Sequence, residues 1–343
     1  MNLGGTLRIN KFACFVLIFL LFLIIYWRSG GNGYPSDTSD LVNIKSILKA
    51  AIIAAERGGE VIVRKGQGIV RSKGKTKEGA NDPVTDADYA SHCAMYFTLK
   101  NAFPRLSVVS EEHAVSDSSC QDQDPIDVEA ALHGQRQINY MADEHVYAKD
   151  VTVWIDPLDA TQEYTEGLYG YVTTMVCVAI NGVPIIGVIH YPFPPTTYWG
   201  WVSKKTSNNI PNVLYNKEIK NHPQVVVSRS HPGKVTELAK KAFGQETSIS
   251  SSAGAGNKFM SIVNGTNNVY LHETAIKKWD LCAGHAILKT NNGTVTTTKG
   301  NIIDYSSAGN AVVKEGILAS FYLAWRRWRD RRIARRARET SRP

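Results

Sequence analysis

The 343-residue sequence has only five cysteines, and no two of them are close neighbours. A zinc site normally needs cysteines at short spacings such as C-x₂-C, so the sequence argues against one. The scattered positions do not indicate a disulfide framework either, and they leave the redox state of the thiols open. The cysteines are Cys14, Cys93, Cys120, Cys177 and Cys282.

The body of the chain also lacks a marked excess of either charge. The formal net charge is +8, but the eighteen residues from Arg326 onward hold nine arginines against Asp330 and Glu339, which places seven of the eight charges there. A broad basic face for nucleic acid is therefore not expected, and we predict no nucleic-acid partner. The basic tail, residues 321–343, is either a solvated appendage or an amphipathic helix on a membrane surface.

One apolar run, residues 12–27, has no charged residue, and Lys11 and Arg28 border it. It is shorter than the roughly 20 residues of a typical membrane span. However, no small-residue cleavage site follows it, and Tyr26 and Trp27 form an aromatic border typical of a membrane interface. We therefore predict an uncleaved signal-anchor helix. The predicted order is a short cytosolic tail (1–11), the anchor (12–28), a stalk (29–39) and a body on the lumenal side.

Clustered acids follow an apolar, strand-like run in the middle of the chain. Asp156 and Asp159 lie in the stretch DPLDAT, directly after residues 151–155, and Thr161 ends it. Acids at the end of a strand lie where α/β folds bind ligands, and carboxylate oxygens suit Mg²⁺. The alternative is an ordinary Asp-Pro turn that leaves a strand.

Three other places offer an acid at the end of a strand or the start of a helix, namely Asp88, Glu111 and Asp280. An aspartate at such a place is first of all a helix cap, so each means little alone. If all of them converge with the central stretch, they form a site for two or three Mg²⁺ ions. The Leu158 carbonyl could then fill a coordination position, and the Thr161 hydroxyl could help to deprotonate a water.

Periodicity and turn residues predict the elements around these acids. A helix begins at a cap on Ser39 or Asp40 and ends at Gly58-Gly59 or at Gly66. Asn181-Gly182 indicates a tight hairpin between two strands. The remaining expectations are a loop or mobile hairpin over 64–80, a polar excursion over 113–150, strands over 106–110, 225–227 and 269–271, and helices over 259–263 and 281–289.

Taken together, the motifs resemble those of the lithium-sensitive, Mg²⁺-dependent phosphatase superfamily that includes inositol monophosphatase. The shared pattern is an acidic pair after a strand (Glu111-Glu112), then W-I-D-P-x-D-x-T over 154–161, then Trp279-Asp280 at the start of a late helix. These motifs lie in that order across most of residues 40–320. The resemblance implies a mixed α+β and α/β fold, a layered αβαβα sandwich with an α+β half (40–205) and an α/β half (206–320).

The resemblance also implies residue roles. Asp88 and Thr161, with Glu111 beside them, would be catalytic and would activate the attacking water. The implied ligands of two or three Mg²⁺ ions are Glu111, Asp156, the Leu158 carbonyl, Asp159 and Asp280.

Within the superfamily, the chain is most similar to the 3′(2′),5′-bisphosphate nucleotidase branch. The elements that carry this likeness are S-R-S-H over 228–231, G-A-G-N-K over 254–258 and K-K-W-D over 277–280. A histidine can hydrogen-bond to or stack on adenine, and a lysine can meet the 5′-phosphate as a point charge. The substrate contacts implied in this way are Thr161, Ser228, His231, Gly254, Lys258 and Asp280.

The branch implies an enzyme that removes the 3′-phosphate from adenosine 3′,5′-bisphosphate (PAP), a by-product of lumenal sulfotransferases. Joined to the anchor, it implies a single-pass type II protein of the Golgi membrane. An inositol phosphate phosphatase and a non-catalytic, membrane-tethered binding protein are the alternatives. Asn264 and Asn292 lie in sequons that only a lumenal body could use. Oligomeric state is not indicated.

Overall fold

The structure is a computed structural model that describes residues 19–20, 40–75, 81–112, 120, 136–211, 223–229, 234–307 and 309–321. The chain divides into two units, Met1–Leu41 and Val42–Pro343. The predicted anchor, stalk and basic tail lie outside the described residues, apart from Phe19, Leu20 and Phe321. Within the described residues, no helix has both the length and the apolar character needed to cross a membrane.

Helices and strands of very different lengths follow one another along the chain. The helices are α2 (Ile44–Lys65), α3 (Asp86–Ala102), α5 (Arg136–Asn139), α6 (Thr161–Thr165), α7 (Val235–Phe243), α8 (Ala255–Val263) and α9 (Lys278–Thr290), with the 3-10 turns η3 (Ala148–Asp150) and η4 (Tyr169–Tyr171). The first strands are β1 (Leu41–Asn43), β2 (Val70–Lys75), β3 (Asn81–Thr85), β4 (Ser107–Ser110), β5 (His145–Tyr147), β6 (Val151–Asp159), β7 (Thr173–Ile180), β8 (Val183–Pro192), β9 (Pro195–Trp201) and β10 (Lys205–Thr206). The later strands are β11 (Gln224–Ser228), β12 (Ser248–Ser252), β13 (Val269–His272), β14 (Ile276–Lys277), β15 (Gly293–Thr297), β16 (Val312–Val313) and β17 (Ile317–Phe321).

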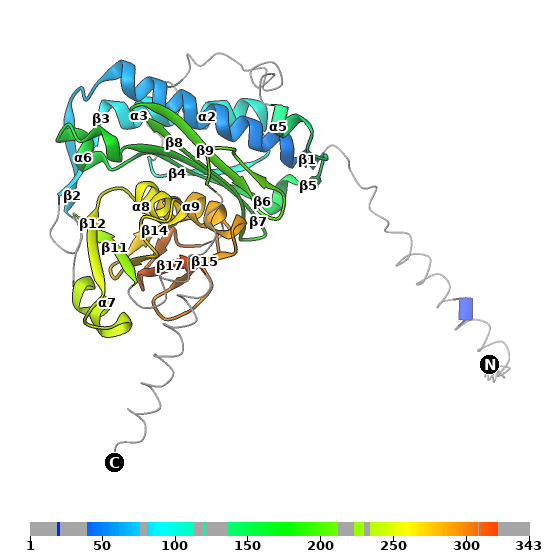
Figure 1. Ribbon diagram of the computed structural model, residues 1–343. Coiled ribbons are helices and arrows are strands. Elements are labelled where there is room, and N and C mark those ends of the chain that lie inside the picture. The colour runs from blue at the N-terminus through cyan, green and yellow to red at the C-terminus, as the bar shows by residue number, and fades with distance from the viewer. Residues whose placement is uncertain are drawn as a thin grey trace, which may run out of the picture. The chain divides into compact units, whose positions relative to one another are not determined.

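Helical layers and sheets alternate in the unit Val42–Pro343 (Figure 1). Helices α2 and α3 cover one face of a six-stranded sheet of order β10-β9-β8-β7-β6-β4. Helices α8 and α9 lie between that sheet and a five-stranded sheet of order β12-β11-β13-β17-β15. Helix α7 packs on the second sheet. The order helix, sheet, helix, sheet, helix agrees with the prediction, while the division into halves at residue 205 stays a prediction.

Strand direction differs between the two sheets. Strands β6 to β10 run antiparallel to their neighbours, and β4 joins the edge parallel to β6. In the second sheet β11 is parallel to both β12 and β13, whereas β17 is antiparallel to β13 and β15. The carboxyl ends of β4 and β6 therefore meet at one edge, which is where the sequence places its acids.

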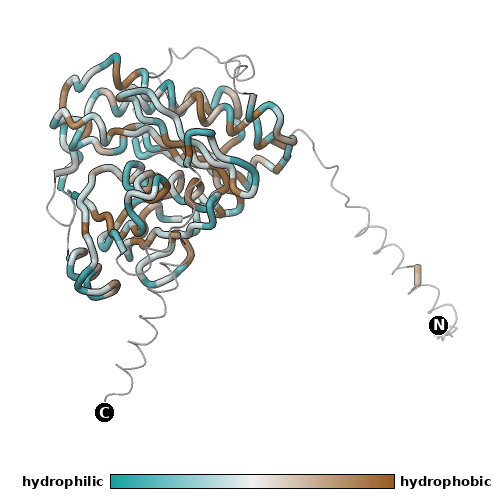
Figure 2. Tube along the Cα trace, in the orientation of Figure 1, coloured by the Kyte–Doolittle hydropathy of each residue, from teal (hydrophilic) through white to brown (hydrophobic). Residues whose placement is uncertain are grey.

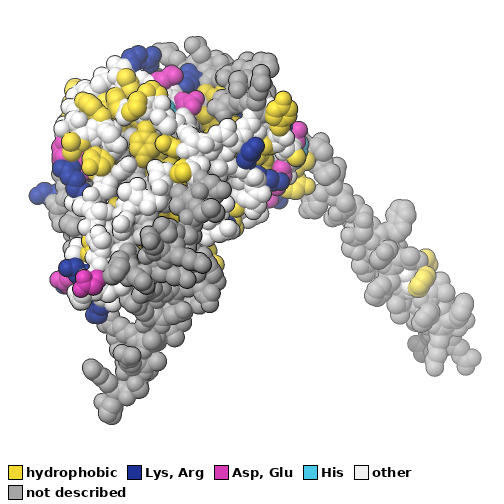
Figure 3. Space-filling model, in the orientation of Figure 1, with side chains coloured by type: hydrophobic (Ala, Val, Ile, Leu, Met, Phe, Trp, Pro, Cys, Tyr) yellow, Lys and Arg dark blue, Asp and Glu magenta, His cyan; other side chains and the backbone are white. Residues whose placement is uncertain are grey.

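Apolar side chains fill the spaces between the layers, and their burial is the main stabilising contribution. Ile47 and Leu48 of α2 pack with Val153 of β6 beneath the first helical layer. Trp154 of β6 faces the other way and packs with Phe259 of α8 between the sheets. Figure 2 shows the corresponding mixture of hydrophobic and hydrophilic residues along the chain. On the face seen in Figure 3, charged side chains of both signs are interspersed.

Helix α2 begins later than predicted and ends at the second of the two predicted positions. Asn43 is the N-cap, because its side chain accepts hydrogen bonds from the backbone nitrogens of Lys45 (2.9 Å) and Ser46 (3.4 Å). The predicted cap on Ser39 or Asp40 is therefore wrong. Gly66, with φ of 66°, ends the helix, and Gly58 lies inside it. A Cβ on Gly58 would come within 2.7 Å of side-chain atoms of α3, so close helix packing explains this glycine.

The predicted hairpin at Asn181-Gly182 is present, and the stretch 64–80, for which a loop or a mobile hairpin was predicted, contains one strand of an antiparallel pair. Asn181 (φ 49°) and Gly182 (φ 75°) join β7 and β8, and a pair of positive φ values is what a two-residue hairpin requires. In the stretch 64–80, β2 pairs antiparallel with β3, and residues 76–80 between them are outside the described residues.

Two disulfides are present within the described residues. One joins Cys93 of α3 to Cys120, and the other joins Cys177 of β7 to Cys282 of α9. The sequence left the redox state of the cysteines open, and the structure pairs four of them. Sequence spacing could not indicate these pairs, because the partners are 27 and 105 residues apart and meet only in the folded chain.

Candidate active site

Three of the predicted acids converge. Glu111 follows β4, Asp156 lies in β6 and Asp280 lies in the first turn of α9, and each offers a carboxylate oxygen within 4.8 Å of the others. Strand register explains the first two, because Ser110 pairs with Ile155 and the Glu111 nitrogen donates to the Ile155 carbonyl at 3.2 Å. Strand pairing therefore brings Glu111 and Asp156 together without any bound ion.

Helix α9 brings the third acid to the same place. The rings of Trp154 in β6 and Trp279 in α9 lie 6.3 Å apart, and Trp154 Nε1 donates to the Tyr305 carbonyl at 2.7 Å. Trp154 precedes Asp156 by two residues and Trp279 directly precedes Asp280, so this packing sets the start of α9 against the end of β6. The two tryptophans of the sequence motifs thus have a positioning role.

Asp156 is the most unusual acid of the group. It is fully buried, and neither of its carboxylate oxygens has a hydrogen-bond partner among the described residues. Burial raises its pKa well above the usual value, and repulsion from Glu111, Asp159 and Asp280 raises it further. A buried carboxylate without a partner is strongly unfavourable. A hard divalent cation held by Asp156, Glu111 and Asp280 would satisfy both oxygens, so the residues present fit Mg²⁺.

Lys73 is a charged neighbour that sequence reasoning missed. Its Nζ lies 3.1 Å from Glu111 Oε1 and also donates to Glu112, from strand β2. Burial would lower the pKa of Lys73, but attraction to Glu111 and Glu112 outweighs it and raises the pKa. Several basic residues occur between 64 and 80, and no sequence signal singles out this one.

Asp159 is held differently from the three acids. Its Oδ1 accepts from the Ala255 nitrogen at 3.0 Å, and its Oδ2 accepts from the Gly256 nitrogen at 2.8 Å and from Thr173 Oγ1 at 3.1 Å. These donors place its carboxylate at the N-terminus of α8, a favourable position for a negative charge. The structure does not place Asp159 in the group of three. Burial and the charge of Glu111 raise the pKa of Asp280, and the charge of Asp159 raises it further. Its assignment as a metal ligand stays a prediction.

The pair predicted to act on water is in contact. Thr161 Oγ1 lies 3.0 Å from Asp88 Oδ1 and 3.0 Å from the Leu158 carbonyl, and its one hydrogen can go to either. Asp88 is buried, which raises its pKa to about 6, although hydrogen bonds from Thr85 lower it. The Leu158 carbonyl thus faces the same hydroxyl, and its role as a metal ligand stays a prediction.

The helix-cap interpretation needs a correction at two acids. The N-cap of α3 is Thr85, not Asp88, and the N-cap of α9 is Lys277, not Asp280. Asp88 and Asp280 each occupy the third helical position and accept a hydrogen bond from the backbone nitrogen of the N-cap residue, at 2.8 and 3.0 Å.

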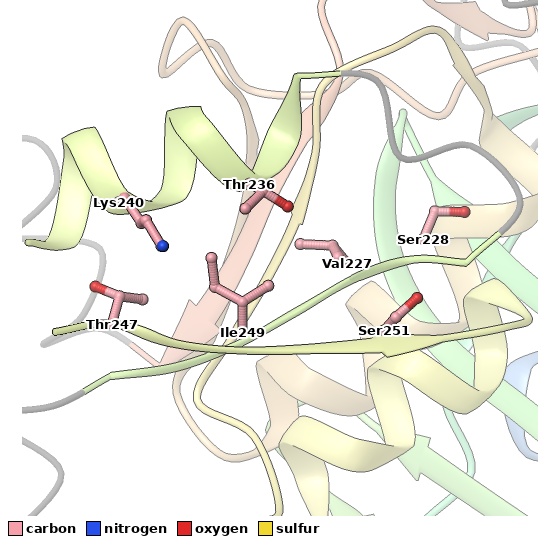
Figure 4. Close-up of a pocket in the computed structure, with 7 residues that line it drawn as sticks. All are labelled: Val227, Ser228, Thr236, Lys240, Thr247, Ile249 and Ser251. Carbon is pink, nitrogen blue, oxygen red and sulfur yellow. The ribbon is translucent and has the colours of Figure 1, made fainter. Parts of the chain in front are cut away.

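The predicted nucleotide contacts are partly described. Ser228, at the end of β11, is buried and lines an open cavity of about 520 Å³ that runs between α7 and the strands β11 and β12 (Figure 4). His231 lies outside the described residues. The other lining residues are Val227, Thr236, Lys240, Thr247, Ile249 and Ser251, so the cavity does not include the acids.

Gly254 and Lys258 lie at the start of α8. Gly254 has φ of 68°, and a Cβ on it would come within 3.0 Å of Asp159 Oδ2 and 2.9 Å of the Tyr171 carbonyl. Lys258 is buried and donates to the Gly254 carbonyl at 2.6 Å. Burial lowers the pKa of Lys258, while the charges of Asp159, Glu163 and Asp280 oppose this. Gly254 therefore adjoins Asp159, Lys258 is held by the Gly254 carbonyl, and the contact of both residues with substrate stays a prediction.

Comparisons with known proteins identify a family and relatives for this chain. Residues 43–340 match the model of the inositol monophosphatase family. The chain is 46% identical over 292 residues to "Inositol monophosphatase 3" of Danio rerio, covering 81% of each chain. It is 42% identical over 301 residues to "Golgi-resident adenosine 3′,5′-bisphosphate 3′-phosphatase" of Mus musculus, covering 85% of this chain and 82% of that one.

The fold has solved neighbours as well. The extragenic suppressor protein suhB of Bartonella henselae superposes with a TM-score of 0.61 at 16% identity, covering 82% of this chain and 97% of that one. At this identity the likeness bears on the fold alone.

Proposed function

The chain belongs to the inositol monophosphatase family, and we propose that it is a Mg²⁺-dependent phosphatase that hydrolyses the 3′-phosphate of PAP to give AMP and inorganic phosphate. The observation that carries the hydrolytic chemistry is the buried Asp156 carboxylate, which lies beside Glu111 and Asp280 and has no hydrogen-bond partner among the described residues. The mouse relative's name supports PAP as the substrate.

In the proposed reaction, Glu111, Asp156 and Asp280 would hold the metal, and Asp159 and the Leu158 carbonyl would add ligands for two or three ions. Mg²⁺, when bound, supplies positive charge that neutralises the transferring phosphoryl group and favours ionisation of the attacking water. Thr161 orients that water through its hydroxyl, and Asp88 accepts the proton that the water loses. The water oxygen forms a bond to phosphorus as the bond between phosphorus and the 3′-oxygen breaks, and the 3′-oxygen takes up a proton from water.

Nucleotide recognition is proposed for the C-terminal half. Ser228, His231, Gly254 and Lys258 contact the nucleotide, Thr161 and Asp280 lie at the phosphate that is removed, and Lys258 supplies a positive charge for the 5′-phosphate. Family membership supports lithium inhibition as an expectation.

A phosphate-release assay over PAP, inositol monophosphates and AMP, with and without lithium, tests this proposal on the purified full chain in detergent with Mg²⁺. PAP is expected to react fastest, and its reaction is expected to be inhibited by lithium. Release from an inositol monophosphate at the same rate or faster would refute the substrate and would favour the second candidate, an inositol phosphate phosphatase. The name of the Danio rerio relative is the observation in favour of that candidate.

We further propose that residues 12–28 anchor the protein in the Golgi membrane as a single-pass type II protein, with the catalytic body in the lumen near sulfotransferases that produce PAP. The two disulfides support a lumenal body, because disulfides persist in oxidising compartments and are rare in the cytosol. Asn264 and Asn292 are both exposed, so their sequons are accessible to glycosylation. A mobility shift on endoglycosidase treatment, lost when both asparagines become glutamine, is expected; a body that external protease digests in intact Golgi vesicles would refute this topology.

A further inference from the structure

Arg229 lies in the S-R-S-H element, yet neither the metal site nor the proposed substrate contacts give it a role. It directly follows Ser228 at the end of β11, and its backbone nitrogen donates to the Ser252 carbonyl at 3.0 Å. Its guanidinium reaches the segment that follows β6 of the other sheet, where Nη1 lies 3.0 Å from Glu163 and Nη2 lies 2.8 Å from Glu166. One planar group thus bridges two carboxylates.

The carboxylates belong to the segment that carries the water-activating hydroxyl. Glu163 is in α6, whose first residue is Thr161, and Glu166 is the C-cap of the same short helix. Among the ion pairs of the described residues, those of Arg229 are the ones that join the chain before β7 to the chain after β10. The bridge therefore links the end of β11 to α6 directly.

The two pairs differ in strength. The Glu163 side chain is 3% exposed, and burial raises its pKa while Arg229 opposes that shift. An arginine paired with a buried carboxylate cannot be removed without leaving an uncompensated charge, which is strongly destabilising. The Glu166 side chain is 35% exposed, and pairs of that kind contribute little.

We propose that Arg229 is a positioning residue that holds α6, and with it the Thr161 hydroxyl, in register with the Ser228 end of β11. This inference deepens the proposed function and rests on the proposed role of Thr161. A phosphate ester that contacts both Ser228 and Thr161 then meets two groups whose separation one guanidinium fixes. Displacement of a reacting group by about 1 Å can cost about 100-fold in rate.

The test compares Arg229→Met, Arg229→Lys and the double variant Glu163→Gln/Arg229→Met with wild type, with the exposed Lys241→Met of α7 as control. Turnover is measured on the phosphate ester that wild type hydrolyses fastest, so that an error in the PAP assignment does not remove the test. Arg229→Met is expected to lose about 10- to 100-fold in kcat and a few degrees in Tm. Arg229→Lys is expected to lose less, because an ammonium group cannot bridge two carboxylates as a guanidinium does but keeps the positive charge beside Glu163.

The double variant separates positioning from stability. Glu163→Gln removes the uncompensated buried charge, so Tm is expected to recover while kcat stays low. Recovery of kcat together with Tm would show a merely structural role, and a kcat for Arg229→Met within about twofold of wild type would overturn the proposal outright. If Arg229→Met does not fold, the test uses Glu166→Gln, which leaves Arg229 paired with the buried Glu163. This variant is expected to lower kcat severalfold at unchanged Tm. An unchanged kcat in Glu166→Gln also overturns the proposal.

Discussion

Asp156→Asn is expected to stabilise the metal-free protein, although it removes a residue proposed to be essential for activity. In the folded chain the Asp156 carboxylate lies within 4.8 Å of oxygens from Glu111 and Asp280. At that distance, with an effective dielectric constant of about 20, each repulsion amounts to about 3 kcal/mol. The asparagine amide would still lack buried partners, which costs about 1–3 kcal/mol. The two repulsions less this cost leave a net gain of about 3–5 kcal/mol, or roughly 6–10 °C in Tm.

The measurement is thermal unfolding of the full chain in a chelator, followed by a Mg²⁺ titration. Wild type is expected to gain stability as Mg²⁺ is added, whereas Asp156→Asn is expected to start higher and gain little. Asp150→Asn, the same change just before the start of β6, serves as the control and is expected to behave as wild type. A variant that is no more stable than wild type in chelator, or that is stabilised equally by Mg²⁺, would refute the reasoning.

The pH dependence has a defined sign. Burial raises the pKa of Asp156 well above 3.8, so the unfolded chain loses this proton first as the pH rises. Above pH 3.8, the folded state therefore binds more protons than the unfolded state. Because the unfolded state binds fewer protons, the stability of the metal-free protein falls as the pH increases. Stability in chelator is therefore expected to fall from about pH 4 upward, and to fall less steeply in Asp156→Asn.

Three further outcomes are expected. Thr161→Val removes the hydroxyl next to Asp88 but keeps the shape of the side chain, so kcat should fall by about 10²- to 10⁴-fold at nearly unchanged Tm, while Thr161→Ser should retain most of the activity. Gly254→Ala should destabilise the protein by more than about 1 kcal/mol in a urea titration, because φ is 68° and the new Cβ would lie 2.9 Å from the Tyr171 carbonyl. Replacing Cys177 and Cys282 by serine opens a loop of 105 residues and should cost about 3–5 kcal/mol in the same titration, more than opening the other disulfide with its 27-residue loop.

Local patterns predicted the strands and the turns that join them. The hairpin at Asn181-Gly182 was predictable because two positive φ values are needed there and these residues tolerate them. The strands β4 and β11 were predictable from short apolar runs bounded by polar residues. Each of these features depends on neighbouring residues alone.

The features that sequence reasoning missed depend on contacts between distant segments. Lys73 binds Glu111 and Glu112, which are 38 and 39 residues further along the chain. Nothing in the sequence distinguishes Lys73 from the other basic residues near it. Arg229 meets Glu163 across 66 residues. The start of α2 was missed for a local reason, since Ser39, Asp40 and Asn43 are all good caps and only the folded chain selects Asn43.

The cap interpretation and the catalytic interpretation of Asp88 and Asp280 are compatible, because each acid does both. In Asp88, Oδ2 accepts the hydrogen bond from the Thr85 nitrogen that closes the helix start, while Oδ1 meets Thr161. In Asp280, Oδ2 accepts from the Lys277 nitrogen, and the residue still offers an oxygen to the group with Glu111. The backbone nitrogen of the N-cap residue holds one oxygen of the carboxylate at the third helical position, and in Asp88 the other oxygen is left to meet Thr161. Capping is thus the means by which α3 and α9 orient their acids, and removal of the cap bond should impair the site even where the acid itself remains.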